Sequence, residues 1–210
     1  MSDTARAIVA VILAGGRGER LGGALKSGLV VGGTRLLERV AGVLSGASPL
    51  LVAHGRHDPE LLGLSKAMVP VADLAGEYAG PLAGVAGAIA WCVAQPAPPL
   101  FLLSVAVDTP FLPADFQPRL MASIGDHAAA LAAYGAQDYP TNALWRLQAI
   151  AALPQQIVAG TAPRSLKRLA AGLDAVRVAW PATASGDPFA NANTPEELAA
   201  LQRRAAGGDA

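Results

Sequence analysis

The sequence AIVAVILAGGRGERLGGALK, residues 7–26, decides how the rest of the chain can be read. Residues 7–14 form a continuous apolar run bounded by glycine, which is typical of a strand covered on both faces. The loop that follows begins with Gly15, Gly16 and Gly18 and carries three basic residues, Arg17, Arg20 and Lys26. Glycine can adopt backbone angles that turn successive N–H groups around an anion, and the basic side chains add positive charge. The stretch therefore predicts a buried strand that leads into a phosphate-binding loop.

Two common phosphate-binding motifs are absent from this loop. A Walker loop has glycine directly before its lysine, whereas Leu25 precedes Lys26. The dinucleotide fingerprint needs its third glycine where Leu21 stands, and Gly22 comes one position late. On the loop alone, a surface loop after a strand is the alternative, so later segments have to decide.

Composition limits the class of protein. The chain has 210 residues, 16 basic and 16 acidic, and a formal net charge of zero, so we expect one domain, residues 1–210, and no nucleic-acid binding. Although 52% of the residues are hydrophobic, no apolar run reaches the roughly 18 residues that span a membrane. The first residues also lack the pattern of a signal peptide. The sequence predicts a cytoplasmic protein with no membrane partner.

Strands and helices alternate along the predicted pattern. Short apolar runs predict strands at residues 7–14, 50–53, 68–71, 100–107 and 176–180. Helical spacing lies between several of these runs, whereas residues 139–145 read as a turn that continues into an apolar segment. Thr34 and Thr194 are candidate N-caps, the latter followed by Pro195 and Glu197. This alternation is the α/β pattern.

Asp108 directly follows the most strand-like run. A carboxylate at the end of a buried strand is well placed for a divalent cation, because Mg²⁺ favours one or two carboxylates together with substrate phosphate oxygens. The alternative is that Asp108 caps the turn before Pro110. Beside a phosphate-binding loop, the metal interpretation is favoured.

Four segments in order resemble the molybdenum cofactor guanylyltransferase family. They are L-A-G-G with its lysine (13–26), G-P-L-A-G (80–84), D-T-P-F-L-P (108–113) and N-A-N-T-P-E-E-L (191–198), and A-L-W (143–145) is a weaker fifth match. The resemblance implies a Rossmann-like three-layer α/β/α sandwich with a mostly parallel central sheet. It also implies transfer of GMP from GTP to molybdopterin with Mg²⁺, and contact with molybdoenzymes as possible partners.

The resemblance also assigns roles to residues. It implies nucleotide binding by Leu13, Ala14, Gly15, Gly16, Lys26 and Asp73, metal binding by Asp108, and pterin binding by Asn191 and Asn193. The chemistry itself joins two anions, so the work is positioning and charge neutralisation, and no nucleophilic side chain is required. Mg²⁺ on Asp108, together with Lys26 and Arg20, would offset the charge of the triphosphate and of the departing pyrophosphate.

Two positions depart from the family's pattern. Leu25 replaces an aspartate before the loop lysine, and Ala53, His54 and Gly55 stand where an asparagine follows the second strand. Three alternatives therefore stay open: a cytidylyltransferase that acts on the same pterin, a nucleotidyltransferase of sugar or alcohol phosphates, and a nucleotide-binding paralogue without catalysis.

Overall fold

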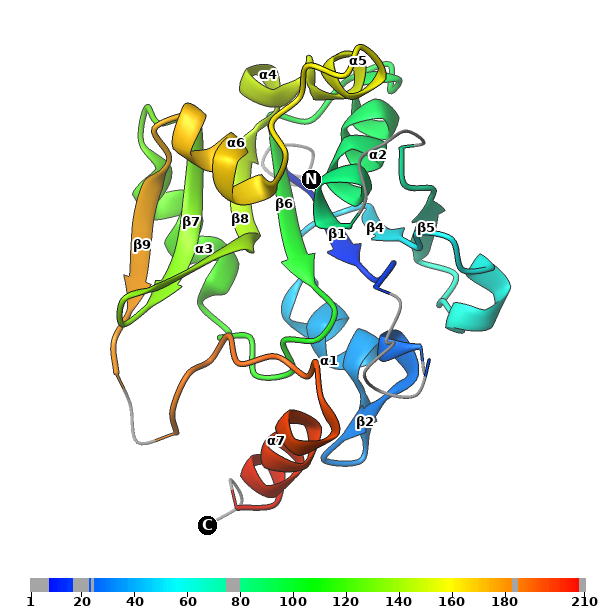
Figure 1. The fold of residues 1–210 in the computed structure, drawn as a ribbon, viewed down its shortest axis with the longest axis vertical. Helices are drawn as coiled ribbons and strands as arrows, with labels where there is room; N and C mark the ends of the chain where they lie inside the picture. The colour runs from blue at the N-terminus through cyan, green and yellow to red at the C-terminus, as the bar shows by residue number, and fades with distance from the viewer. Residues whose placement is uncertain (1–7, 17–22, 24, 75–79, 183–184, 208–210) are drawn as a thin grey trace.

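Seven strands form one central sheet. The computed structural model describes residues 8–16, 23, 25–74, 80–182 and 185–207, and its sheet has the order β5-β4-β1-β6-β8-β7-β9 (Figure 1). The strands are β1 (Ile8–Leu13), β4 (Leu50–Ala53), β5 (Met68–Val71), β6 (Phe101–Ala106), β7 (Ala129–Tyr134), β8 (Gln137–Arg146) and β9 (Val176–Trp180). Only β8 runs antiparallel to its neighbours, β6 and β7. The mostly parallel sheet expected from the sequence is confirmed.

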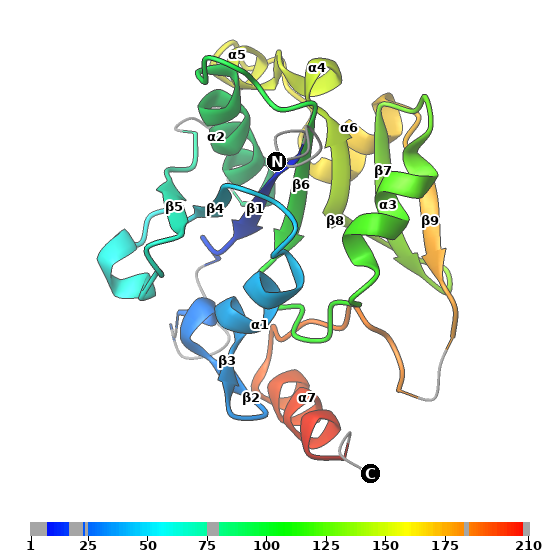
Figure 2. The same ribbon diagram turned by 180° about the vertical axis from the view of Figure 1, so that it is seen from behind.

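Helices cover both faces of the sheet (Figures 1 and 2). One face packs against α2 (Pro81–Val93), α4 (Leu147–Ile150), α5 (Leu153–Val158) and α6 (Leu166–Gly172), and the other against α1 (Leu36–Val43) and α3 (Phe116–Ile124). Val9 and Val11 of β1 belong to the first core, whereas Ile8, Ala10 and Ile12 belong to the second. This burial on both sides explains why β1 is apolar without alternation.

Helix α2 lies unusually close to the segment that follows β5. A Cβ atom added to Gly87 would lie 2.1 Å from the carbonyl oxygen of Ala72. One turn earlier, the carbonyl of Ala83 accepts a hydrogen bond from the N–H of Leu74 at 3.0 Å. The small residues of α2 therefore fix the backbone on either side of Asp73.

The two predicted helix caps have different outcomes. Thr194 caps α7 (Pro195–Gly207): its hydroxyl accepts from the N–H of Glu197 at 3.2 Å, and the Glu197 carboxylate accepts from the N–H of Thr194 at 3.1 Å. The prediction for Thr34 is wrong. Thr34 pairs with Val31 in a hairpin of β2 (Val30–Val31) and β3 (Thr34–Arg35), so it is extended and α1 begins only at Leu36.

Helix α7 lies beyond the carboxyl edge of the sheet, next to the β2–β3 hairpin (Figure 1). Leu201 of α7 packs there with Val31, Leu36 and Ala192 in a small separate core. Helix α7 thereby holds the preceding segment, residues 187–194, across the end of the sheet. No helix among the described residues has the length and apolar character needed to cross a membrane.

Candidate active site

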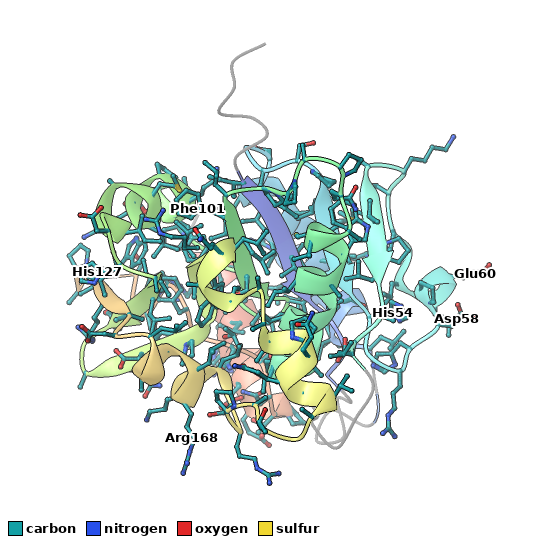
Figure 3. The ribbon with its side chains drawn as sticks, turned by 90° about the horizontal axis from the view of Figure 1, so that it is seen from above. His54, Asp58, Glu60, Phe101, His127 and Arg168 are labelled. Carbon is teal, nitrogen blue, oxygen red and sulfur yellow. The ribbon has the colours of Figure 1, made fainter. Side chains whose placement is uncertain are left out.

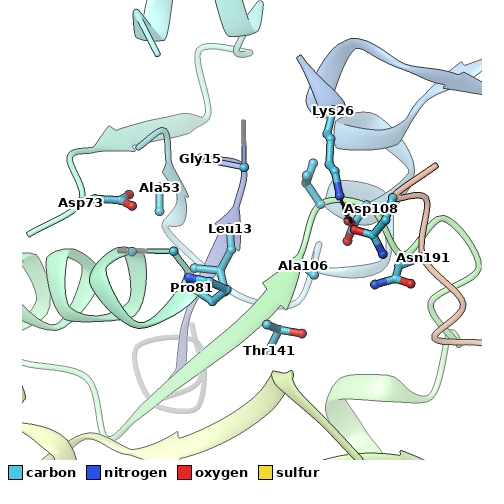
Figure 4. A pocket seen from close by; sticks show the side chains of 15 residues that line it. Leu13, Gly15, Lys26, Ala53, Asp73, Pro81, Ala106, Asp108, Thr141 and Asn191 are labelled. Atoms are coloured by element: carbon cyan, nitrogen blue, oxygen red, sulfur yellow. Dashed lines mark hydrogen bonds and ion pairs between the residues drawn. The ribbon is translucent and has the colours of Figure 1, made fainter. Parts of the chain in front are cut away.

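A cavity of about 240 Å³ opens at the carboxyl edge of the sheet (Figure 4). In a mostly parallel open sheet this edge is where ligands bind, because loops diverge there. Four strands, β1, β4, β6 and β8, and the start of α2 contribute to the walls. The lining residues are Leu13, Gly15, Gly16, Lys26, Ala53, Asp73, Gly80, Pro81, Gly84, Ala106, Val107, Asp108, Thr141, Asn191 and Asn193.

Three polar side chains meet at one end of the cavity. Lys26 begins a short 3-10 helix (Lys26–Gly28), and its Nζ lies 2.5 Å from Asp108 Oδ2 and 2.7 Å from Asn193 Oδ1. The side chains of Lys26 and Asp108 are only 13% and 11% exposed. Asn191 lines the cavity beside them (Figure 4). This end offers one cation, one carboxylate and two amides, which suits a phosphate group and its counter-ion.

The residues at this end fit a divalent cation completed by a substrate. Asp108 follows β6 and presents a hard oxygen donor, and its oxygen already attracts a cationic group, the Lys26 ammonium. Among the described residues no group of three or more His, Cys, Asp or Glu could hold a metal ion. A cation here would therefore take most of its ligands from phosphate oxygens and water.

Two histidines, His54 and His57, tie the loop after β4 to itself and to the loop after β1. His54 Nδ1 lies 2.8 Å from the carbonyl oxygen of His57, and His57 Nε2 lies 3.2 Å from the carbonyl oxygen of Gly16. His127 lies on the opposite flank of the molecule from His54 (Figure 3). The spacing of the first two histidines thus serves the loop after β4.

Asp73 lies at the other end of the cavity, across Leu13 and Gly15 from Lys26 (Figure 4). Its Oδ1 accepts a hydrogen bond from the N–H of Gly55 at 3.0 Å. Burial raises the pKa of Asp73, and the Gly55 bond and the nearby histidines, His54 and His57, oppose that rise only in part. A second acceptor thus lies at a distance from the phosphate end, where a nucleoside could extend.

Gly55 packs directly on Gly15. A Cβ atom on Gly55 would lie 2.7 Å from the Cα of Gly15, and Gly55 has φ +62°. A side chain at this position would have to push the backbone at Gly15 aside. The close packing of the loop after β4 on the loop after β1 therefore requires glycine at residue 55.

Most of the predicted site residues line this one cavity: Leu13, Gly15, Gly16, Lys26, Asp73, Asp108, Asn191 and Asn193. Ala14 does not line it. Ala14 is 2% exposed, and its N–H donates to the carbonyl of Ala53 at 2.9 Å, which ties the loop to β4. Arg20 lies outside the described residues.

Sequence reasoning missed Thr141 and its neighbour Asn142. Thr141 lines the cavity, and Asn142 is fully buried with its Oδ1 accepting from the N–H of Ala106 at 2.9 Å. Within the described part of the chain, Asn142 Nδ2 has no hydrogen-bond partner. A buried donor left in this way costs about 1–3 kcal/mol. The only available signal was a pair of polar residues directly before the apolar run at residues 143–145.

Comparison with known proteins agrees with this geometry. Residues 10–176 match the MobA-like NTP transferase domain. A molybdenum cofactor guanylyltransferase from Bradyrhizobium is 35% identical over 207 residues, which is 98% of this chain and 96% of the relative.

Solved structures share the fold at lower identity. Molybdopterin-guanine dinucleotide biosynthesis protein A from Archaeoglobus fulgidus superposes with a TM-score of 0.68 at 22% identity, over 93% of this chain and 97% of that one. 2-C-methyl-D-erythritol 4-phosphate cytidylyltransferase from Thermus thermophilus gives 0.64 at 19% identity, over 93% and 98%. With a matching family domain, a close relative along nearly its whole length and a shared fold, the chain belongs to the molybdenum cofactor guanylyltransferase family of MobA-like NTP transferases and is a nucleotidyltransferase.

Proposed function

We propose that this nucleotidyltransferase, acting as one domain, transfers GMP from GTP to the phosphate of molybdopterin and releases pyrophosphate, with Mg²⁺ as its cofactor. The observation that carries the proposal is the meeting of Lys26, Asp108 and Asn193 in a cavity at the carboxyl edge of the sheet. The Bradyrhizobium relative supports the choice of substrates.

The reaction makes and breaks one bond at the α-phosphorus. A phosphate oxygen of molybdopterin attacks it, and the bond to the oxygen that bridges to the β-phosphorus breaks, so that pyrophosphate leaves. Because both reactants are anions, the chain's main task is to bring them together and to neutralise charge. The Lys26 ammonium provides that charge, and the backbone at Gly15 and Gly16 lines the same cavity. Mg²⁺ held by Asp108 would neutralise phosphate charge and orient the triphosphate.

The two ends of the cavity would divide the substrates. Asp73 would contact the nucleoside, whereas the amides of Asn191 and Asn193 would hydrogen-bond the pterin substrate. Arg20 would add positive charge for the departing pyrophosphate. This role would put the protein in the cytoplasm, in contact with molybdoenzymes or other proteins of cofactor synthesis.

A cytidylyltransferase acting on the same pterin is the second candidate. The observation in its favour is the segment Ala53, His54 and Gly55, which holds no asparagine after the second strand, and Gly55 leaves no room for a side chain. The preference for GTP or CTP therefore has to be measured for this chain and is not taken from the name of its relatives.

The test is an assay of dinucleotide and pyrophosphate formation. Molybdopterin is supplied with GTP, CTP or ATP, each with Mg²⁺, and we expect product with GTP. Asp108→Asn should reduce turnover by about a hundredfold or more while the fold is retained. Asp126→Asn, which changes an exposed carboxylate away from the cavity, is the matched control and should keep full activity. Product with CTP alone would support the second candidate, and no product with any nucleotide would overturn both.

A further inference from the structure

The pairing of strand β8 with its two neighbours is interrupted where β8 lies beside the cavity. Its pairing with β6 ends at Ser104 opposite Ala143. On its other side, the register with β7 passes from Leu131 opposite Ala143 to Ala132 opposite Tyr139. Residues 140–142 of β8 therefore have no partner on β7 and form a bulge. Bulges beside active sites commonly redirect side chains.

The bulge redirects two side chains to the end of β6. Thr141 lines the cavity, and Asn142 is fully buried. The Oδ1 atom of Asn142 accepts from the N–H of Ala106 at 2.9 Å, where a regular ladder would have offered a backbone carbonyl. The Asn142 side chain thus replaces the missing ladder bond at the last residue of β6.

The next peptide group, between Ala106 and Val107, is held from two further directions. The carbonyl of Ala106 accepts a hydrogen bond from Thr109 Oγ1 at 2.7 Å, and the N–H of Val107 donates to the carbonyl of Leu13 at 3.3 Å. Asp108 lies between these anchored residues. The direction in which its carboxylate leaves the sheet therefore depends on how firmly Ala106 is held.

We propose that Asn142 is a positioning residue for Asp108: by holding the N–H of Ala106 it orients the Asp108 carboxylate for the divalent cation that accompanies the nucleotide. The proposal rests on the proposed function, in which Asp108 binds that cation. Asn142 itself contacts neither the nucleotide nor the metal and acts only through the end of β6.

The unpaired Nδ2 atom allows this role to be separated from stability. Asn142→Leu has nearly the same shape, and it removes one unpaired buried donor, Nδ2, while it leaves another, the N–H of Ala106. We therefore expect Tm to change by less than about 4 °C. The orientation of the Asp108 carboxylate should be lost even if stability is unchanged, because the N–H of Ala106 no longer has its acceptor.

The measurement is the affinity for GTP by calorimetry, once with Mg²⁺ and once with EDTA. The ratio of the two affinities reports the contribution of the cation and needs neither molybdopterin nor turnover. In Asn142→Leu we expect this ratio to fall by about tenfold, the lower end of the effect of supporting contacts around metal ligands. Affinity in EDTA should stay unchanged.

Ser104→Ala is the matched control. Ser104 is a second fully buried polar residue on the same strand pair, and its Oγ accepts from Trp145 Nε1 at 2.9 Å. Its loss should lower Tm without changing the ratio. Thr109→Val removes the hydrogen bond to the carbonyl of Ala106 and should also lower the ratio of the two GTP affinities. This variant tests the inference if Asn142→Leu does not fold.

The outcomes are distinct. An unchanged ratio in folded Asn142→Leu, or in Thr109→Val if the former does not fold, would overturn the inference and leave the proposed function standing. An equal fall in Ser104→Ala would also overturn it, since any buried change would then have the same effect. A wild-type protein whose GTP affinity gains nothing from Mg²⁺ would remove the metal role of Asp108 and the inference with it.

Discussion

Lys26 Nζ and Asn193 Oδ1 lie 2.7 Å apart, although 167 residues separate them in the chain. The backbone of Asn193 is itself fixed, because its N–H donates to the Glu197 carboxylate at 2.7 Å in the first turn of α7. The cap of the last helix therefore helps to orient the lysine that follows the first strand. The family resemblance assigns Asn193 to the pterin, but in this chain its side chain also contacts the ammonium group of Lys26.

Lys26→Met should weaken GTP binding by about tenfold to a hundredfold, the effect of one charged hydrogen bond of about 1.5–3 kcal/mol. The free energy of unfolding should fall by less, because water in the open cavity can solvate Asp108 once the ammonium is gone. Calorimetry with GTP and urea unfolding measure the two quantities. Lys66→Met, at an exposed lysine, is the control. Equal GTP affinity in Lys26→Met and the parent would exclude the phosphate role.

Asp73→Asn should be at least as stable as the parent at neutral pH and bind GTP more weakly. Burial raises the pKa of Asp73, so the folded state holds its proton more tightly than the unfolded state. Stability from this group therefore falls as pH rises from about 4, its unfolded pKa, to the higher folded pKa. The amide oxygen of the new asparagine can still accept the hydrogen bond from the Gly55 N–H. The difference in unfolding free energy between Asp73→Asn and the parent should therefore vanish as pH falls toward about 4. Denaturant unfolding across this range checks it, and a constant difference would contradict the assignment.

Gly55→Ala should lower stability by about 2–3 kcal/mol, because it adds both a positive-φ penalty and a contact 2.7 Å from Gly15. GTP affinity should fall as well, since relief requires the phosphate-binding loop to move. Gly42→Ala on α1 is the control: its Cβ would have no atom within 4 Å, and the change should add up to about 1 kcal/mol. If Gly55→Ala were as stable as the parent, the loop after β4 would be able to move away from Gly15 at little cost, which would contradict the steric argument.

Tyr139→Phe should weaken the hold on the segment that carries Asn191. The Tyr139 hydroxyl donates to Asp187 Oδ2, and Asp187 Oδ1 accepts from the N–H of Phe189 at 2.8 Å. Loss of the hydroxyl should cost about 1–2 kcal/mol of stability and raise KM for molybdopterin several-fold, with GTP affinity unchanged. Urea unfolding and steady-state kinetics measure these effects. A rise in KM for GTP alone would contradict the division of the cavity.

Short apolar runs were the most predictable part of the fold. The runs at β4, β5 and β9 match the structure residue for residue, although β5 and β9 are edge strands with exposed residues. Strand β8 was missed at its start, since Tyr139 and Pro140 read locally as a turn and pairing with β7 overrides that signal. The prediction of Thr34 as an N-cap was wrong for a related reason, because Thr34 pairs with Val31 in a hairpin and is therefore extended.

The site was predictable only as far as motifs reached. The resemblance named eight residues that line one cavity, but no local pattern indicates that Lys26 meets Asn193 or that Asn142 holds Ala106. Both contacts join segments far apart in sequence. Such pairs depend on how the sheet is assembled, which spacing within a segment does not encode.

The bond between Lys26 and Asn193 also has a consequence for biosynthesis. Lys26 is synthesised 167 positions before Asn193. Because chains are made from the amino end, Lys26 and Asp108 both leave the ribosome before Asn193 and the cap of α7 exist. A nascent chain that has not yet reached Asn193 would therefore lack the contact that orients Lys26, and the ability to bind nucleotide would develop only after α7 is made.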